Sequence, residues 1–134
     1  MSTMILPNLP VSDVNRATAF YTALGFVVNP QFTNEQAAAI VVSDDIVLML
    51  LSPDFAAEHS VALPSNTPNV SLALTESGRD AVDARIDKAL AAGATLRGET
   101  TDLGFMYSRG ISDPDGHFWD FLWMDPGAVE AYEA

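Results

Sequence analysis

The residues best suited to chemistry lie in a short apolar stretch near the C-terminus, DPDGHFWDFLWMDP at 113–126. Its centre holds a carboxylate, Asp120, between bulky apolar neighbours. A carboxylate in such surroundings needs a partner or a purpose, because an unpaired buried charge is costly. Four roles are open to Asp120: a metal ligand, a general base, a hook for a cationic ligand, or one half of a structural ion pair.

Metal-ligating side chains are scarce in the chain. It has no cysteine and two histidines, His59 and His117. A catalytic transition metal needs about three converging imidazole or carboxylate ligands. Strand alternation points His117 away from the face that carries Asp120, so the two cannot share a metal in a regular strand. The sequence therefore predicts that no divalent metal cofactor is bound, with Asp120 as the only plausible remnant of a metal site.

The preceding segment, FMYSRGIS at 105–112, is predicted to form an antiparallel hairpin with HFWDFLWM at 117–124. A four-residue turn at 113–116 would place Arg109 directly opposite Asp120. This register predicts a cross-strand ion pair that satisfies the carboxylate. It also gathers five residues on one face as candidates for binding or reaction: Tyr107, Arg109, Phe118, Asp120 and Leu122.

Two readings of this face remain open. In the first, Arg109 and Asp120 form a structural pair, or the polar part of a binding site with apolar walls. In the second, Tyr107 and Asp120 are catalytic and act as acid and base on a bound molecule.

The elements that must position these residues come in two similar halves. Helices are predicted at 12–25, where Ser12 or Asp13 can cap, and at 77–93, where Ser77 and Asp80 resemble a capping box; each ends at a glycine. An apolar strand precedes each helix and three strand candidates follow it, so both halves read β-α-β-β-β.

The sequence therefore predicts one α+β domain over 1–134, built of two βαβββ modules that form a mixed sheet. Module one spans about 4–52 and module two about 69–124. A linker at 53–68 carries three prolines and a short helical turn at 54–58.

Composition narrows the classes of partner. The net charge of −12 argues against nucleic acid, whose phosphates require a basic surface, and favours a neutral or cationic small molecule. No apolar run approaches the roughly 20 residues that cross a bilayer, and MSTMIL lacks the basic segment of a signal peptide. We therefore expect a cytoplasmic protein with no membrane partner.

The two-module pattern, together with LPVSDVNRATAFYTALGF and DPDGHFWDF, resembles the vicinal oxygen chelate superfamily of glyoxalases, bleomycin resistance proteins and extradiol dioxygenases. The segments NPQFTNEQAA, GFMYSRG and DPDGHFWDFLWMDP look like its bacterial branch often labelled predicted lactoylglutathione lyase. The resemblance implies a cupped sheet, a homodimer, and a ligand site in the concavity.

The resemblance also implies where the superfamily's enzymes hold their metal. Those positions fall on Leu6, on Leu50 or a neighbour, on Asn69 and on Asp120, and only Asp120 is a good ligand. Asn8 shares strand parity with Leu6. The expected ligand-binding set is therefore Asn8, Asn69, Arg109, Phe118 and Leu122.

These observations predict a small-molecule-binding member of the superfamily without a complete metal site, which sequesters a cationic or aromatic compound. The alternative is a lyase, isomerase or dioxygenase of the same superfamily, similar to lactoylglutathione lyase, with an altered site around Asp120. A subunit for protein interaction is the third possibility. The sequence leaves open whether the protein is an enzyme.

Overall fold

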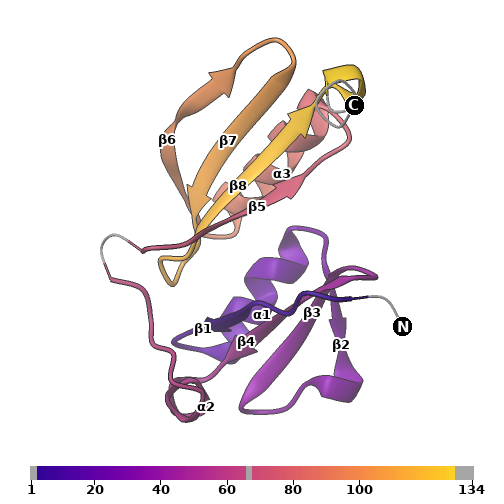
Figure 1. Ribbon diagram of the computed structural model, residues 1–134. Coiled ribbons are helices and arrows are strands. Elements are labelled where there is room, and N and C mark those ends of the chain that lie inside the picture. Colours follow the sequence, from indigo (N-terminus) through magenta and orange to yellow (C-terminus); the bar gives the residue numbers. More distant parts are fainter. Residues whose placement is uncertain (1–2, 66–67, 129–134) are drawn as a thin grey trace. The chain divides into compact units, whose positions relative to one another are not determined.

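The computed structural model describes residues 3–65 and 68–128. The chain divides into two compact units, Met1–Asn66 and Thr67–Ala134. Each unit holds one four-stranded mixed sheet and a long helix between its first and second strands (Figure 1). The predicted α+β class and the β-α-β-β-β order of both halves are confirmed.

Unit one has the strand order β1-β4-β3-β2. Its first strand runs parallel to β4, and the other neighbours are antiparallel. A short 3-10 helix, η1, follows β2 directly in the sequence. The bounds are β1 (Asn8–Pro10), α1 (Val14–Ala23), β2 (Val27–Asn29), η1 (Pro30–Phe32), β3 (Ala37–Ser43) and β4 (Ile46–Leu51).

Helix α1 begins and ends as its sequence predicts. The Asp13 side chain accepts a hydrogen bond from Arg16 N at 3.1 Å, and Gly25 adopts a φ of 104° after the helix. The helix packs against β3 and β4 through its buried residues Val14, Ala17, Phe20 and Tyr21. This apolar contact forms the core of unit one.

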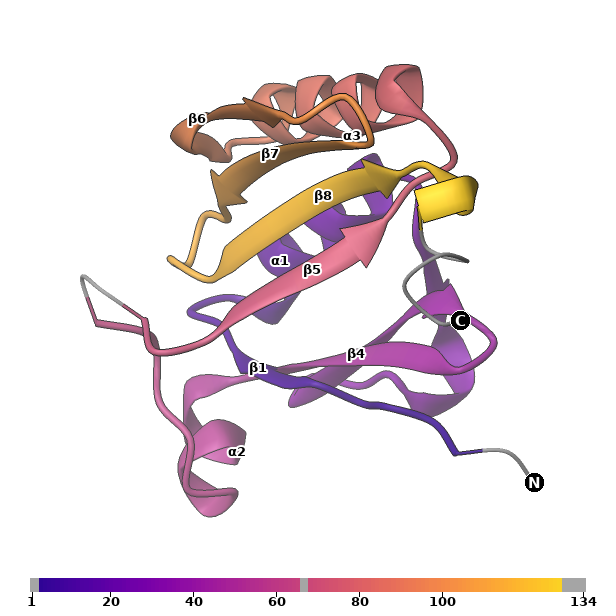
Figure 2. The ribbon, with the colours of Figure 1, turned by 45° about the horizontal axis from the view of Figure 1, so that its top comes forward.

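Unit two has the strand order β5-β8-β7-β6, which Figure 2 shows with β8 between β5 and β7. Helix α3 packs against β7 and β8 through Val82, Ile86 and Ala89. Its N-cap is Gly78, with no side-chain hydrogen bond, so the predicted capping box of Ser77 and Asp80 is wrong. The bounds are β5 (Ser71–Thr75), α3 (Arg79–Ala91), β6 (Thr95–Asp102), β7 (Met106–Ser112) and β8 (Phe118–Met124).

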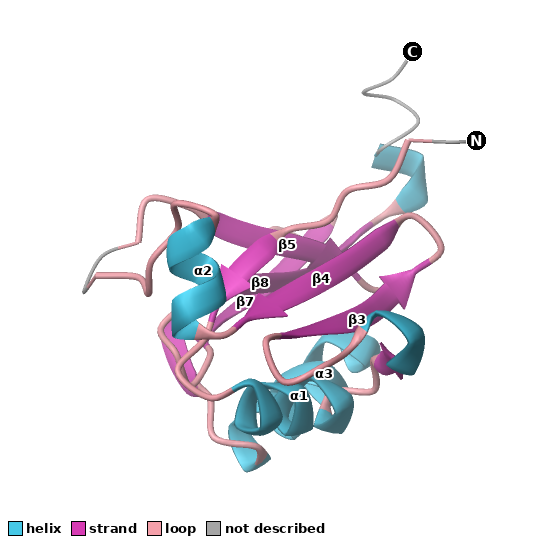
Figure 3. Ribbon diagram, turned by 90° about the horizontal axis from the view of Figure 1, so that it is seen from below, coloured by secondary structure: helices cyan, strands magenta, loops and turns pink. Residues whose placement is uncertain are grey.

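The segment between β4 and β5 contains a short helix, α2 (Pro53–Glu58), beside β4 (Figure 3). The Ser52 hydroxyl caps it by accepting from Phe55 N at 3.2 Å. The helical turn predicted at 54–58 is confirmed, while residues 66–67 of the predicted linker lie outside the described part. None of the helices in the described ranges has the length and apolar character needed to span a bilayer.

The β7–β8 hairpin differs from its predicted register by one residue. Asp113 N donates to His117 O at 2.9 Å, which leaves a three-residue connection, 114–116, in place of the predicted four. The Asp113 carboxylate explains the shift, because its Oδ1 accepts from the backbone N of Asp115 and of His117, both at 2.9 Å. Gly116, with a φ of 94°, completes this turn.

The new register decides which residues share a face of the sheet. Gly110, not Arg109, lies opposite Asp120, and Arg109 lies opposite Phe121. One face lies against α3 and carries Tyr107, Arg109, Ile111, Trp119, Phe121 and Trp123. We call the other face the open face; it carries Ser71, Ala73, Thr75, Arg97, Ser108, Gly110, Phe118, Asp120 and Leu122.

Candidate functional site

The most distinctive group on the open face is an ion pair between Asp120 of β8 and Arg97 of β6. Arg97 Nη2 donates to Asp120 Oδ1 at 2.7 Å, and each side chain is 30% exposed. The guanidinium carbon of Arg97 lies 4.6 Å from the ring centroid of Phe118. The pair is therefore a partly solvated, charge-neutral polar centre that stacks on an aromatic ring.

Gly110 makes room for this pair from the strand between them. A Cβ atom at position 110 would lie 2.8 Å from Asp120 Oδ1 and 3.0 Å from the carbonyl oxygen of Arg97. The first separation is shorter than real Cβ contacts show, and the second is tighter than nine in ten of them. The glycine thus permits the two charged side chains to meet across β7.

Arg97 is the functional candidate that the sequence-based prediction missed. The sequence predicts a partner for Asp120 on β7, whereas Arg97 lies on β6, the strand beyond it. Arg97 lies opposite Gly110. Directly after Arg97 the pairing of β6 with β7 shifts its register, and Gly98 in this bulge takes a φ of 69°. The sequence held one signal for this contact: Gly110 in an otherwise apolar strand, with Arg97 as the arginine of the neighbouring predicted strand.

The predicted ion pair between Arg109 and Asp120 is wrong. Arg109 Nη1 instead donates to Asp83 Oδ1 of α3 at 3.0 Å, and the Tyr107 hydroxyl donates to the same oxygen at 2.7 Å. Tyr107 and Arg109 therefore lie on the α3 side of the sheet, whereas Asp120 lies on the open face. Because the sheet separates them, Tyr107 and Asp120 cannot act together as acid and base on one molecule, and Arg109 cannot join Asp120 in a binding site.

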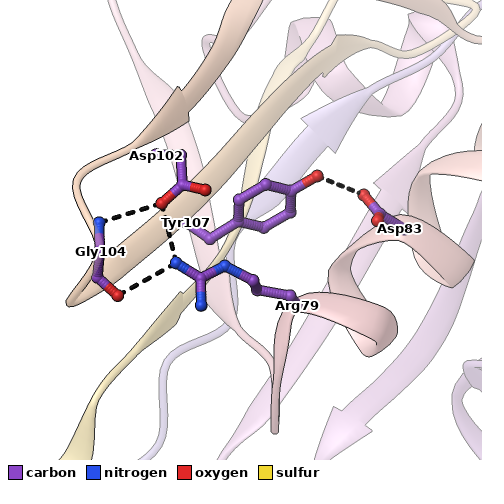
Figure 4. A network of polar contacts seen from close by, with 5 residues as sticks. All are labelled: Arg79, Asp83, Asp102, Gly104 and Tyr107. Atoms are coloured by element: carbon purple, nitrogen blue, oxygen red, sulfur yellow. Dashed lines mark hydrogen bonds and ion pairs between the residues drawn. The ribbon is translucent and has the colours of Figure 1, made fainter.

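A second polar network fixes the turn between β6 and β7 (Figure 4). Arg79 Nη2 donates to Asp102 Oδ1 at 2.8 Å and to the Gly104 carbonyl at 3.0 Å. Its guanidinium carbon lies 5.7 Å from the Tyr107 ring centroid and 4.9 Å from that of Trp123. The backbone N–H of Gly104, and then Arg79, lowers the pKa of Asp102. This network secures the hairpin to the start of α3.

The contacts of Asp83 give stability a defined dependence on pH. The hydrogen bond from Tyr107, followed by that from Arg109, lowers the pKa of Asp83, and burial opposes them. The same bond to Asp83 raises the pKa of Tyr107. The contribution of Asp83 is therefore complete above its unfolded pKa of about 3.9 and is lost as pH falls through its lower folded value. That of Tyr107 is complete below about pH 10 and is lost as pH rises through its higher folded value.

We expect Asp83→Asn to weaken the dependence of unfolding free energy on pH below about pH 4, because this variant has no carboxylate to protonate. Urea unfolding at several pH values measures the effect. Asp87→Asn, an exposed carboxylate of the same helix, is the matched control. Equal flattening by both variants would show that the Tyr107 and Arg109 contacts do not stabilise the ionised form of Asp83.

The remaining predicted residues lie in both units. Phe118 and Leu122 lie on the open face, and Asn69 is exposed just before β5. Asn8 is the exposed first residue of β1 in unit one, opposite Met49. Their roles in ligand binding stay predictions.

Comparison with known proteins identifies the fold. The profile of the bleomycin resistance protein-like N-terminal family matches residues 3–43. A hypothetical protein from S. aureus superposes with a TM-score of 0.76 at 26% identity, covering 92% of this chain and 94% of that chain. A glyoxalase/bleomycin resistance protein/dioxygenase family enzyme from Burkholderia phytofirmans superposes with a TM-score of 0.77 at 16% identity, covering 92% and 99%. The chain therefore has the fold of the vicinal oxygen chelate superfamily, and the family profile matches its N-terminal part.

The shared fold agrees with the resemblance seen in the sequence, but a fold does not name a reaction. A lactoylglutathione lyase from Agrobacterium tumefaciens superposes with a TM-score of 0.65 at 19% identity, covering 92% of this chain and 94% of that chain. At this identity the likeness shows the superfamily fold alone. No protein with curated annotation matches the chain.

The positions at which the superfamily's enzymes hold their metal carry few metal-binding side chains in this chain. Of the positions that the resemblance assigns, Leu6 is aliphatic and 46% exposed, and Leu50 is fully buried in the core. Met49, the neighbour of Leu50, faces the other side of β4 but has only a thioether. Within the described ranges no group of three or more His, Cys, Asp or Glu side chains could hold a metal ion. The donor set does not fit a mononuclear site, and Asp120 is engaged by Arg97.

Proposed function

We propose that this superfamily member binds a small aromatic molecule on the open face of unit two. The observation that carries the proposal is the Arg97–Asp120 pair stacked on Phe118. Around it the open face carries small, hydroxyl-bearing or apolar side chains, including Ala73, Ser108, Gly110 and Leu122. A few polar groups among apolar or small residues are typical of sites for small organic molecules.

The ion pair changes which ligand the site favours. The prediction of a cationic or aromatic ligand rested on the net charge of −12 and on the family resemblance. Because Arg97 compensates Asp120 at 2.7 Å, the support for a cation is weaker, and the Phe118 ring still supports an aromatic ligand. We propose binding or sequestration without a resident metal as the role. The homodimer and the cytoplasmic location stay predictions.

A thermal-shift screen of neutral and charged aromatic compounds tests the proposal. A compound that binds the folded state should raise Tm, by the equivalent of about 2.7 kcal/mol at a hundredfold excess over its Kd. We expect Phe118→Ala to abolish the shift, because it removes the stacking surface. Phe105→Ala is the matched control, since Phe105 is an exposed phenylalanine of the β6–β7 turn.

Two outcomes would contradict the proposal. One is a ligand-induced shift that Phe118→Ala leaves unchanged while Phe105→Ala removes it. The other is calorimetric binding of zinc or nickel at one ion per chain that Asp120→Ala abolishes, since this would favour the enzyme alternative around Asp120.

A further inference from the structure

The Arg97–Asp120 pair leaves hydrogen-bonding capacity on both partners. A single bond joins Nη2 to Oδ1, so the contact is end-on and not the two-bond fork that an arginine and a carboxylate can form. No described residue donates a hydrogen bond to Asp120 Oδ2. On Arg97, whose side chain is 30% exposed, Nη1 donates no hydrogen bond to a described residue. The buried Nε also has no acceptor among the described residues, but a ligand cannot reach it. The pair therefore offers Asp120 Oδ2 as a spare acceptor and Arg97 Nη1 as a spare donor.

This arrangement has a chemical complement. A ligand group with an acceptor next to a donor could accept from the guanidinium and donate to Asp120 Oδ2 at the same time. A primary amide has this pattern and is planar. With an aromatic ring attached, it could also share the stacking surface that Phe118 gives to Arg97.

The charge of a ligand should decide how tightly it binds beside the ion pair. A cationic ligand would be attracted by Asp120 but repelled by Arg97. An anionic ligand would be attracted by Arg97 but repelled by Asp120 and by the protein's net charge of −12. A neutral group suffers neither repulsion. On these grounds the ion pair would disfavour both cations and anions, because each partner repels the ion that the other attracts.

We propose that the Arg97–Asp120 pair is the specificity-determining element of the open face and selects uncharged, planar aromatic ligands that carry an amide-like acceptor and donor side by side. This inference rests on the proposed function, since it names the ligand class of the same site. Arg97 and Asp120 both contact the ligand, and Gly110 provides the space in which they meet.

Three probes of matched shape test the inference: benzamide, benzamidine and benzoate, which at neutral pH are neutral, cationic and anionic. Titration of the 15N-labelled protein should shift the backbone amide signals of Ser108, Gly110 and Asp120. We expect benzamide to bind about tenfold more tightly than either ion. A preference of the wild-type protein for benzamidine or benzoate would overturn the inference while leaving the proposed function intact.

Variants of each partner should redirect the preference. Arg97→Met keeps an unbranched apolar stem but removes the guanidinium and frees the carboxylate, so benzamidine should become the tightest probe. Asp120→Asn is nearly isosteric and leaves the guanidinium uncompensated, so benzoate should become the tightest. If either folded variant keeps the wild-type order of affinities, the pair does not select the ligand.

The two proposals fail in distinguishable ways. If none of the three probes shifts the open-face signals and no aromatic compound raises Tm, the proposed function fails and the inference falls with it. If aromatic compounds bind but ignore charge, the inference alone fails. Circular dichroism on each variant ensures that a lost preference is not lost folding.

Discussion

Replacing Gly110 with valine is expected to lower the stability of the protein by about 2–3 kcal/mol, because the added atoms overpack a filled space. This corresponds to a fall in Tm of roughly 10 °C for a chain of this length. At an ordinary strand position the same change would be neutral or favourable, since a β-branched residue suits an extended backbone better than glycine does. At position 110 the first added carbon already meets Asp120 Oδ1 at 2.8 Å and the Arg97 carbonyl at 3.0 Å.

Differential scanning calorimetry with two controls would isolate the cause. Ser108→Val places the same side chain on the same strand and face, two residues away, and should leave Tm nearly unchanged. The double variant Gly110→Val, Asp120→Ala should recover part of the lost stability, because it removes the nearest contact. A Gly110→Val protein as stable as the wild type would show that the close approach of Arg97 and Asp120 does not occur.

Replacing Trp119 with alanine is expected to cost about 3–5 kcal/mol, the usual range for a large aromatic side chain in a core. Trp119 is 1% exposed on the α3 side of β8, and its ring stacks on Phe121 with centroids 6.2 Å apart. The cost arises from the lost burial and from the cavity that would remain beneath α3.

Leu122→Ala is the matched control for Trp119→Ala, since Leu122 lies on the same strand but on the open face, and partly exposed. We expect it to cost less than about 1 kcal/mol, because little apolar surface is lost from a packed core. Chemical denaturation of both variants gives the comparison. A larger loss for Leu122→Ala than for Trp119→Ala would reverse the assignment of the two faces.

The architecture was predictable because it follows from local patterns. Apolar residues at helical spacing, with Gly25 and Gly93 as left-handed stops, place α1 and α3. Strict alternation along 118–123 correctly separates Trp119 and Phe121 from Asp120. These patterns involve only residues that are close in the sequence, and the geometry of a helix or strand alone fixes which of them share a face.

The site was only partly predictable, because it depends on how strands align. The pattern of one strand is enough to predict Asp120 as a polar group on an apolar face. To predict its partner, the register of the hairpin must also be known. The Asp113 side chain shifts that register by one residue, because it accepts two backbone hydrogen bonds. A shift of one residue exchanges the faces, so Arg109 and Tyr107 moved to the α3 side together.

The sequence by itself determined the two βαβββ modules, both long helices, and a lone carboxylate on one face of the last strand. Only the tertiary structure decided what that carboxylate meets: Arg97, 23 residues earlier and two strands away, across a glycine that leaves it room. The difference has a physical reason. Strand parity is a property of the local backbone, whereas a cross-strand partner depends on turn geometry and on the packing of distant segments.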